Sequence, residues 1–321
     1  MIWLLTIVFW VMASPAMAIQ LVTGSYVGNA IDNTDIVMSP PCQPVAVFVK
    51  RDTATVELYA RFNSMGTNIS KSVTGTATES STNIKSFNSN GFRLGTGSST
   101  NGNGSTHYYV AICDTGNSDI AFNTWAGDNT DNKDIAISPA FTPELVIILQ
   151  SGSGGQSWRG ANSHTGDDAS RLNSTLDSVS NEIQSFAGTG FQVGSAQNST
   201  GTTYYSMAIK ASSGALTGSF SGDATDNRNI TAINTPKFAL LKGDSSTNKP
   251  AYRFGLTGDN AWCSSNAQAS NIIQSFSSTG FQIGTNSCAN ENAVTIFWFT
   301  LADATGSSGT RRAVAPLFFT P

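Results

Sequence analysis

One unit occurs three times along the chain, and this repetition constrains the fold more than any other feature of the sequence. The pattern I-x-S-F, followed by G-F-x-[aliphatic]-G, is found at residues 84–95, 183–194 and 273–284. A second pattern, G-x-x-x-D-N-x-x-I, precedes it each time, at residues 28–36, 127–135 and 222–230. Between the two patterns a proline stands before an apolar run, at Pro44, Pro143 and Pro236. Chance similarity among Ser- and Thr-rich segments would not preserve this order.

The repeats predict three domains of roughly 95 residues, a length typical of a folded sandwich. We place the first repeat at 19–117, the second at 118–213 and the third at 214–305, and we expect the apolar tail 306–321 to dock on one of them. Within each repeat, short apolar runs alternate with polar residues and end at Gly, Asn or Pro, as antiparallel strands do. We therefore predict an all-β protein of three tandem antiparallel β-sandwiches, jelly-roll-like or concanavalin-like.

The first 18 residues have the pattern of an export signal. Residues 2–12 are apolar, and Ala16-Met17-Ala18 is a small-x-small site, so we expect a secretory signal peptide (1–18) that is cleaved after Ala18. The alternatives are an uncleaved anchor and a buried strand. No later stretch is long and apolar enough to predict a membrane span after cleavage. We expect a secreted protein, located extracellularly, on the cell surface or in the periplasm.

Four cysteines in an exported chain favour disulfides over a metal site. Three pairings are possible. We favour Cys42 with Cys113 and Cys263 with Cys288, because each pair then lies within one repeat. The alternative is four reduced, buried thiols.

Composition excludes some function classes. Only 12% of the residues are charged, the net charge is −4 and no Lys/Arg block occurs, so we do not expect a nucleic-acid partner. Catalytic patterns are scarce, and we expect no enzyme. The nearest candidates for the paired acids of a glycan-active hydrolase, a remote alternative, are Asp167 and Asp168, with Asp259 in the third repeat.

The repeated patterns, with the aromatic strands 108–111 and 204–208 that close the first two repeats, resemble a domain of tail-fibre and other receptor-contacting proteins of tailed phages. The likeness covers nearly the whole chain after residue 18, three times. It implies non-enzymatic β-sandwich modules that serve in attachment or as virion parts. The chain departs from the family in its signal peptide, and in having Phe48, Ile148 and Leu240 where that family commonly has Trp. A secreted cellular protein is therefore favoured over a virion part.

An aromatic residue and an arginine recur at one place in each repeat. The pairs are Tyr59 with Arg61, Trp158 with Arg159, and Tyr252 with Arg253. A ring beside a planar donor suits sugar binding, because CH faces stack on the ring while NH groups bond hydroxyls. The alternative is that the ring packs in the sandwich and the arginine reaches water.

The Asp-Asn turns of the second pattern gather oxygen ligands, which calcium prefers. The candidate calcium ligands are Asp128, Asp131, Asn132, Asp223, Asp226 and Asn227. The alternative is an Asx turn, in which the side chain bonds its own backbone.

Together these features predict a non-enzymatic, multivalent binding protein that attaches to a surface glycan or cell-surface receptor. Three linked copies of a weak site raise avidity. The alternative is a self-associating structural protein of a fibre or surface layer.

Overall fold

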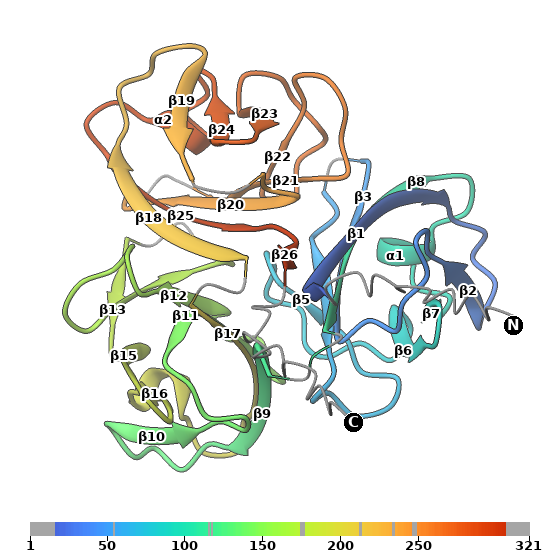
Figure 1. Ribbon diagram of the computed structural model, residues 1–321. Coiled ribbons are helices and arrows are strands. Elements are labelled where there is room, and N and C mark those ends of the chain that lie inside the picture. The colour runs from blue at the N-terminus through green and yellow to red at the C-terminus, as the bar shows by residue number, and fades with distance from the viewer. Residues whose placement is uncertain are drawn as a thin grey trace, which may run out of the picture.

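The protein is nearly all β. In the computed structural model, 49% of the chain is strand and 4% is helical, which confirms the predicted all-β class (Figure 1). The structure describes residues 17–53, 55–114, 116, 118–173, 177–211, 214–232, 235–245 and 249–305. Most of the predicted signal peptide, residues 1–16, and the predicted docked tail, 306–321, lie outside the described residues. No helix in the described ranges is both long and apolar enough to cross a membrane.

The first repeat forms a large and a small antiparallel sheet. Its elements are β1 (Met17–Val27), β2 (Thr34–Val37), β3 (Ala46–Arg51), β4 (Tyr59–Phe62), β5 (Lys71–Ser72), β6 (Ile84–Asn88), β7 (Gly91–Leu94), α1 (Ser98–Asn101) and β8 (Thr106–Asp114). The large sheet has the order β26-β1-β8-β3-β4-β5, and the small sheet has the order β2-β7-β6.

The second repeat has the same plan. Its elements are β9 (Ile120–Ala126), β10 (Lys133–Ala136), β11 (Pro143–Gln150), β12 (Ser157–Gly160), β13 (Asp168–Arg171), β14 (Val179–Ser180), β15 (Ile183–Ala187), β16 (Gly190–Val193), η1 (Ser195–Gln197) and β17 (Thr203–Lys210). The large sheet is ordered β14-β13-β12-β11-β17-β9 and the small one β10-β16-β15.

The third repeat repeats the plan again, and its last strand crosses to the first repeat. Its elements are β18 (Ala215–Ser221), β19 (Arg228–Thr231), β20 (Phe238–Gly243), β21 (Ala251–Phe254), β22 (Trp262–Cys263), β23 (Ile273–Ser277), β24 (Gly280–Ile283), α2 (Ser287–Asn290), β25 (Thr295–Leu301) and β26 (Ala304–Thr305). The sheets are β18-β25-β20-β21-β22 and β19-β24-β23, while β26 pairs with β1.

The two repeated patterns build the small sheet. The I-x-S-F and G-F segments form a hairpin, and its glycine packs directly against the neighbouring strand. A Cβ added to Gly91 would lie 1.9 Å from the carbonyl oxygen of Ile36, so only glycine fits. The Asn of each Asp-Asn pair has a positive φ of 56–59°, a conformation that asparagine tolerates in turns.

Two kinds of hydrophobic core hold the fold together. Each repeat has its own core between its large and small sheets. The opposite faces of the three large sheets meet in one central core that draws residues from every repeat (Figure 1). Rings cross the repeat boundaries there: the centroids of Phe48 and Phe238 lie 5.3 Å apart, and those of Trp158 and Phe299 5.1 Å apart. The three lobes therefore share one interior.

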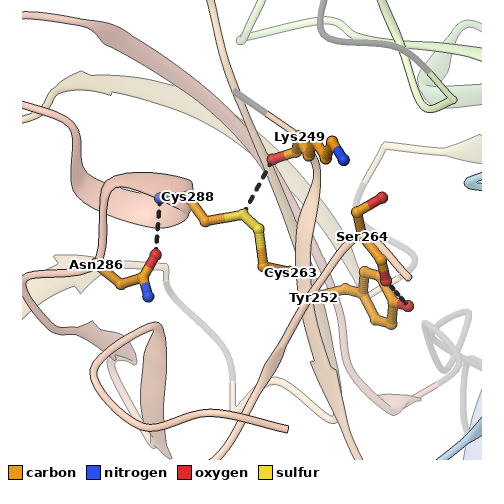
Figure 2. The surroundings of a disulfide bond; sticks show 6 residues. All are labelled: Lys249, Tyr252, Cys263, Ser264, Asn286 and Cys288. Atoms are coloured by element: carbon orange, nitrogen blue, oxygen red, sulfur yellow. Dashed lines mark hydrogen bonds between the residues drawn. A yellow bond between two sulfur atoms is a disulfide. The ribbon is translucent and has the colours of Figure 1, made fainter. Parts of the chain in front are cut away.

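The disulfides join the predicted pairs. Cys42 is bonded to Cys113, and Cys263 to Cys288, so each bond lies within one repeat. Figure 2 shows the second bond, where Asn286 accepts a hydrogen bond from the backbone N–H of Cys288 at 2.9 Å. Disulfides of this kind are typical of extracellular proteins.

Candidate functional site

The predicted aromatic–arginine platforms are buried, and the sugar-platform prediction is therefore wrong. Exposed fractions are 7% for Tyr59, 7% for Arg61, 0% for Trp158, 8% for Arg159, 0% for Tyr252 and 5% for Arg253. A sugar ring needs an open aromatic face to stack on. None of these six side chains offers one.

The alternation of side chains along a strand explains why the aromatic rings are buried. Successive side chains of a strand point to opposite faces, so Trp158 and Tyr252 enter the central core while the arginine after each faces the core of its own repeat. The register also shows that Tyr59 is not their equivalent. Trp158 pairs with Ile147 as Ala60 pairs with Phe48, so Ala60 is the matching position in the first repeat.

The recurrent arginine fastens the loop that follows its strand. Arg253 donates to the carbonyl oxygens of Ile273 at 3.0 Å and Gly258 at 2.7 Å, and it also bonds Asn260. Its guanidinium lies 5.6 Å from the ring centre of Phe276, the phenylalanine of I-x-S-F. The other two repeats place Arg61 over one such ring and Arg159 over the other.

Burial costs each of these cations part of its hydration. Desolvation lowers the pKa of Arg61 to about 10 and also lowers the pKa of Arg159 and Arg253. A buried cation bonded to backbone carbonyls and stacked on a ring has a structural role.

The Asp-Asn turns are Asx turns, closed by the protein's own donors. In the second repeat, Asp128 accepts the backbone N–H of Thr130 at 2.9 Å and pairs with Lys133 at 2.7 Å. Asp131 accepts from the amide of Asn132 at 2.9 Å and from Gln184 at 3.2 Å. The bonds to Asp128 itself, led by that from Lys133, hold the pKa of the Asp128 carboxyl well below its usual range.

The third repeat has the same arrangement. Asp223 accepts the backbone N–H of Thr225 at 2.9 Å and pairs with Arg228 at 3.1 Å, and its bonds to Thr225 lower its pKa to about 2. Asp226 accepts from Asn227 and from Gln274, each at 2.9 Å. In the described ranges, no three His, Cys, Asp or Glu side chains gather as a metal site would require. The geometry supports the turn and gives the calcium hypothesis no support.

The sequence pattern does not single out His164, whose position only the structure shows. The side chain is buried, 4% exposed, with its ring nitrogens 2.8 Å from the hydroxyls of Ser163 and Ser170. The ring stacks on Phe297 of the third repeat at 4.3 Å. Burial, with Arg159 nearby, lowers the pKa of His164 to about 3, so the imidazole is neutral at pH 7.

The other candidates for acid–base chemistry also have structural partners. His107 is buried and stacked on Tyr26, and desolvation lowers its pKa to about 4. Asp167 accepts the backbone N–H of Asn181, and Asp259 accepts that of Asn271, so both acids cap the same loop in their repeats.

A hollow between the first and second repeats is the strongest candidate site. It encloses about 260 Å³ and is lined by Val45, Asn63 and Asp114 from the first repeat and by Ile120, Phe122, Ser138 and Pro139 from the second. A hollow of about 320 Å³ adjoins it, shares the first three residues and adds Gln43 and Pro44. We call the two together the junction cleft. Their volumes are near the lower end for small-ligand sites, about 300 Å³.

The lining of the junction cleft combines apolar surface with a few polar groups. The half-buried ring of Phe122 lies beside Val45, and the exposed side chain of Asn63 supplies an amide. Asp114 supplies a carboxylate, one oxygen of which accepts the backbone N–H of Gly116 at 3.0 Å. No Lys or Arg occurs among the described residues that line the cleft. Such a lining suits a small ligand with both hydroxyls and an apolar face.

Comparison of the chain with protein-family models, with curated proteins and with solved structures finds no match in any of the three.

Proposed function

We propose that this protein is a secreted, non-enzymatic binding protein that attaches to surface carbohydrate. The junction cleft is the observation that carries the proposal, because it brings a ring, an amide and a carboxylate to one concave place. A pyranose has the matching chemistry, with CH groups for the ring and hydroxyls for the polar groups.

The buried histidines support a binding role over a hydrolytic one. A general acid or base needs a pKa near the working pH and access to substrate. His107 and His164 have pKa values of about 4 and 3 and lie in the interior. Asp167 and Asp259 are engaged in capping a loop.

The edges of the sheets favour the binding function over the alternative, self-assembly into a fibre or surface layer. Addition of strands from chain to chain needs a long, flat, open edge. In the large sheets, the outer strands β5, β14, β22 and β26 are each two residues long. The other outer strands, β9 and β18, are seven residues long but lie at the junctions between repeats, where Thr124 bonds Ser64 and Thr217 bonds Glu144. Such edges offer few backbone groups to another copy.

A glycan array probed with the purified chain tests the proposal, with light scattering at the same concentrations as the test of assembly. We expect saturable binding to a restricted set of glycans and a monomeric mass. Absence of binding to every glycan, with a mass that rises with concentration, would replace the proposal by the structural alternative.

A further inference from the structure

The three junctions between repeats occupy equivalent places, yet the residue at their centre differs. It is the residue that directly follows the recurrent proline: Val45, Glu144 and Lys237. Each stands one place before the first inward-pointing residue of the central strand of its large sheet, Ala46, Leu145 or Phe238. Comparison of these positions shows how each junction is closed.

At the junction of the second and third repeats, Glu144 forms a bridge. The side chain is 6% exposed, and its Oε1 accepts the backbone N–H of Thr217 at 3.1 Å and the hydroxyl at 2.6 Å. Asn162 donates to the same oxygen at 2.9 Å. This buried, hydrogen-bonded carboxylate joins the second repeat directly to β18 of the third.

At the junction of the third and first repeats, Lys237 has the corresponding role. Its ammonium donates to the carbonyl oxygen of Leu21 at 2.9 Å and pairs with Asp303 at 2.6 Å. Asp303 in turn accepts the backbone N–H of Leu21 at 2.8 Å. The bridge ties β1 to the end of the third repeat, again across the junction.

At the junction of the first and second repeats the bridging position holds Val45, whose aliphatic side chain cannot form either bridge. The place of Thr217 is taken by Phe122, since the two occupy the same register on β18 and β9. These repeats are held together elsewhere, for example by the Thr124 hydroxyl, which donates to the carbonyl of Ser64 at 3.2 Å. The junction cleft lies where the other two junctions have their bridges.

We infer that the protein binds one saccharide unit per chain, in the junction cleft, and that the equivalent places at the other two junctions do not bind. This inference rests on the proposed carbohydrate-binding function and replaces the threefold valency expected from the repeats. Phe122 offers the apolar surface, and Asn63 offers donors and an acceptor for hydroxyls.

Titration calorimetry with methyl glycosides of neutral hexoses and N-acetylhexosamines, and with N-acetylneuraminic acid as the acidic probe, tests the inference. We expect one site per chain for each glycoside that binds. Asn63→Trp, which fills the cleft from an exposed position, should abolish binding, and Asn63→Ala should weaken it at least fivefold. Asn103→Ala, at an exposed position near the opposite end of β8, is the matched control and should bind as the parent does.

The outcomes separate the inference from the function on which it rests. Three sites per chain, or unchanged binding by Asn63→Trp with an unaltered melting temperature, would overturn the inference and leave carbohydrate binding in place. If Asn63→Trp has a lower melting temperature than the parent, the affinity of Asn63→Ala and the number of sites per chain test the inference instead. Absence of binding by the parent chain to every glycoside and every arrayed glycan would overturn both.

Discussion

Replacing Trp158 by alanine should destabilise all three repeats together. The indole is fully buried in the central core, where it packs against His164 of its own repeat and Phe299 of the third. Removal of a buried tryptophan side chain leaves a cavity and costs about 3–5 kcal/mol. That is a large part of the roughly 5–15 kcal/mol by which proteins are stable. Since the core is shared, we expect one unfolding transition at lower denaturant concentration.

Urea unfolding, combined with hydrogen exchange resolved on peptides from each repeat, measures this effect. The control is Trp125→Ala, because Trp125 packs in the second repeat's own core, against Tyr204 and Phe191. We expect the control to increase exchange mainly in the second repeat, and Trp158→Ala to increase it in all three. The reasoning is refuted if Trp158→Ala leaves exchange in the first and third repeats at the parent level, or costs less than about 1 kcal/mol.

Three further predictions follow from the same contacts. The free energy of unfolding should fall as the pH drops below about 6.5, because His107 and His164 are protonated in the unfolded chain but stay neutral in the folded protein down to about pH 4 and 3. At pH 5 the loss is about 2 kcal/mol for each histidine. Denaturation measured against pH should show that His164→Gln lacks the part of this pH dependence that comes from His164. The double variant Cys263→Ser, Cys288→Ser opens a loop with a sequence separation of 25, and its free energy of unfolding, measured in guanidinium, should fall by roughly 3 kcal/mol. An unchanged free energy would mean that this part of the unfolded chain is compact without the disulfide. Chelation by EDTA should leave the melting temperature unchanged, because the Asp-Asn turns are closed by the protein's own donors, and a lower value would restore the calcium hypothesis.

Local structure could be predicted from the sequence because it depends on residues that are near neighbours in the chain. The alternation of apolar residues defines strands, and a glycine or an Asp-Asn pair defines the turn beside them. The repeats also allowed one long-range contact to be predicted, the disulfide, since two cysteines within the same repeat are the expected partners. Cys42–Cys113 and Cys263–Cys288 follow from that argument.

The candidate site could not be predicted, because a strand with a period of two has two faces and the sequence does not say what covers each. Trp158 and Tyr252 looked available for a ligand, but the second face of every large sheet is covered by the other repeats. The burial of His164 could not be predicted for the same reason, since Phe297, which covers it, lies 133 positions further along the chain.

The sequence by itself therefore determined the strands, the turns, the threefold repetition and the disulfide partners. Only the tertiary structure decided which faces are buried and which junctions are bridged. The physical reason is that burial is set by contacts between residues about a hundred positions apart, which packing brings together and which leave no local pattern. Val45, Glu144 and Lys237 follow the same proline, and only the packed repeats show that two of them bridge a junction while the third lines a cleft.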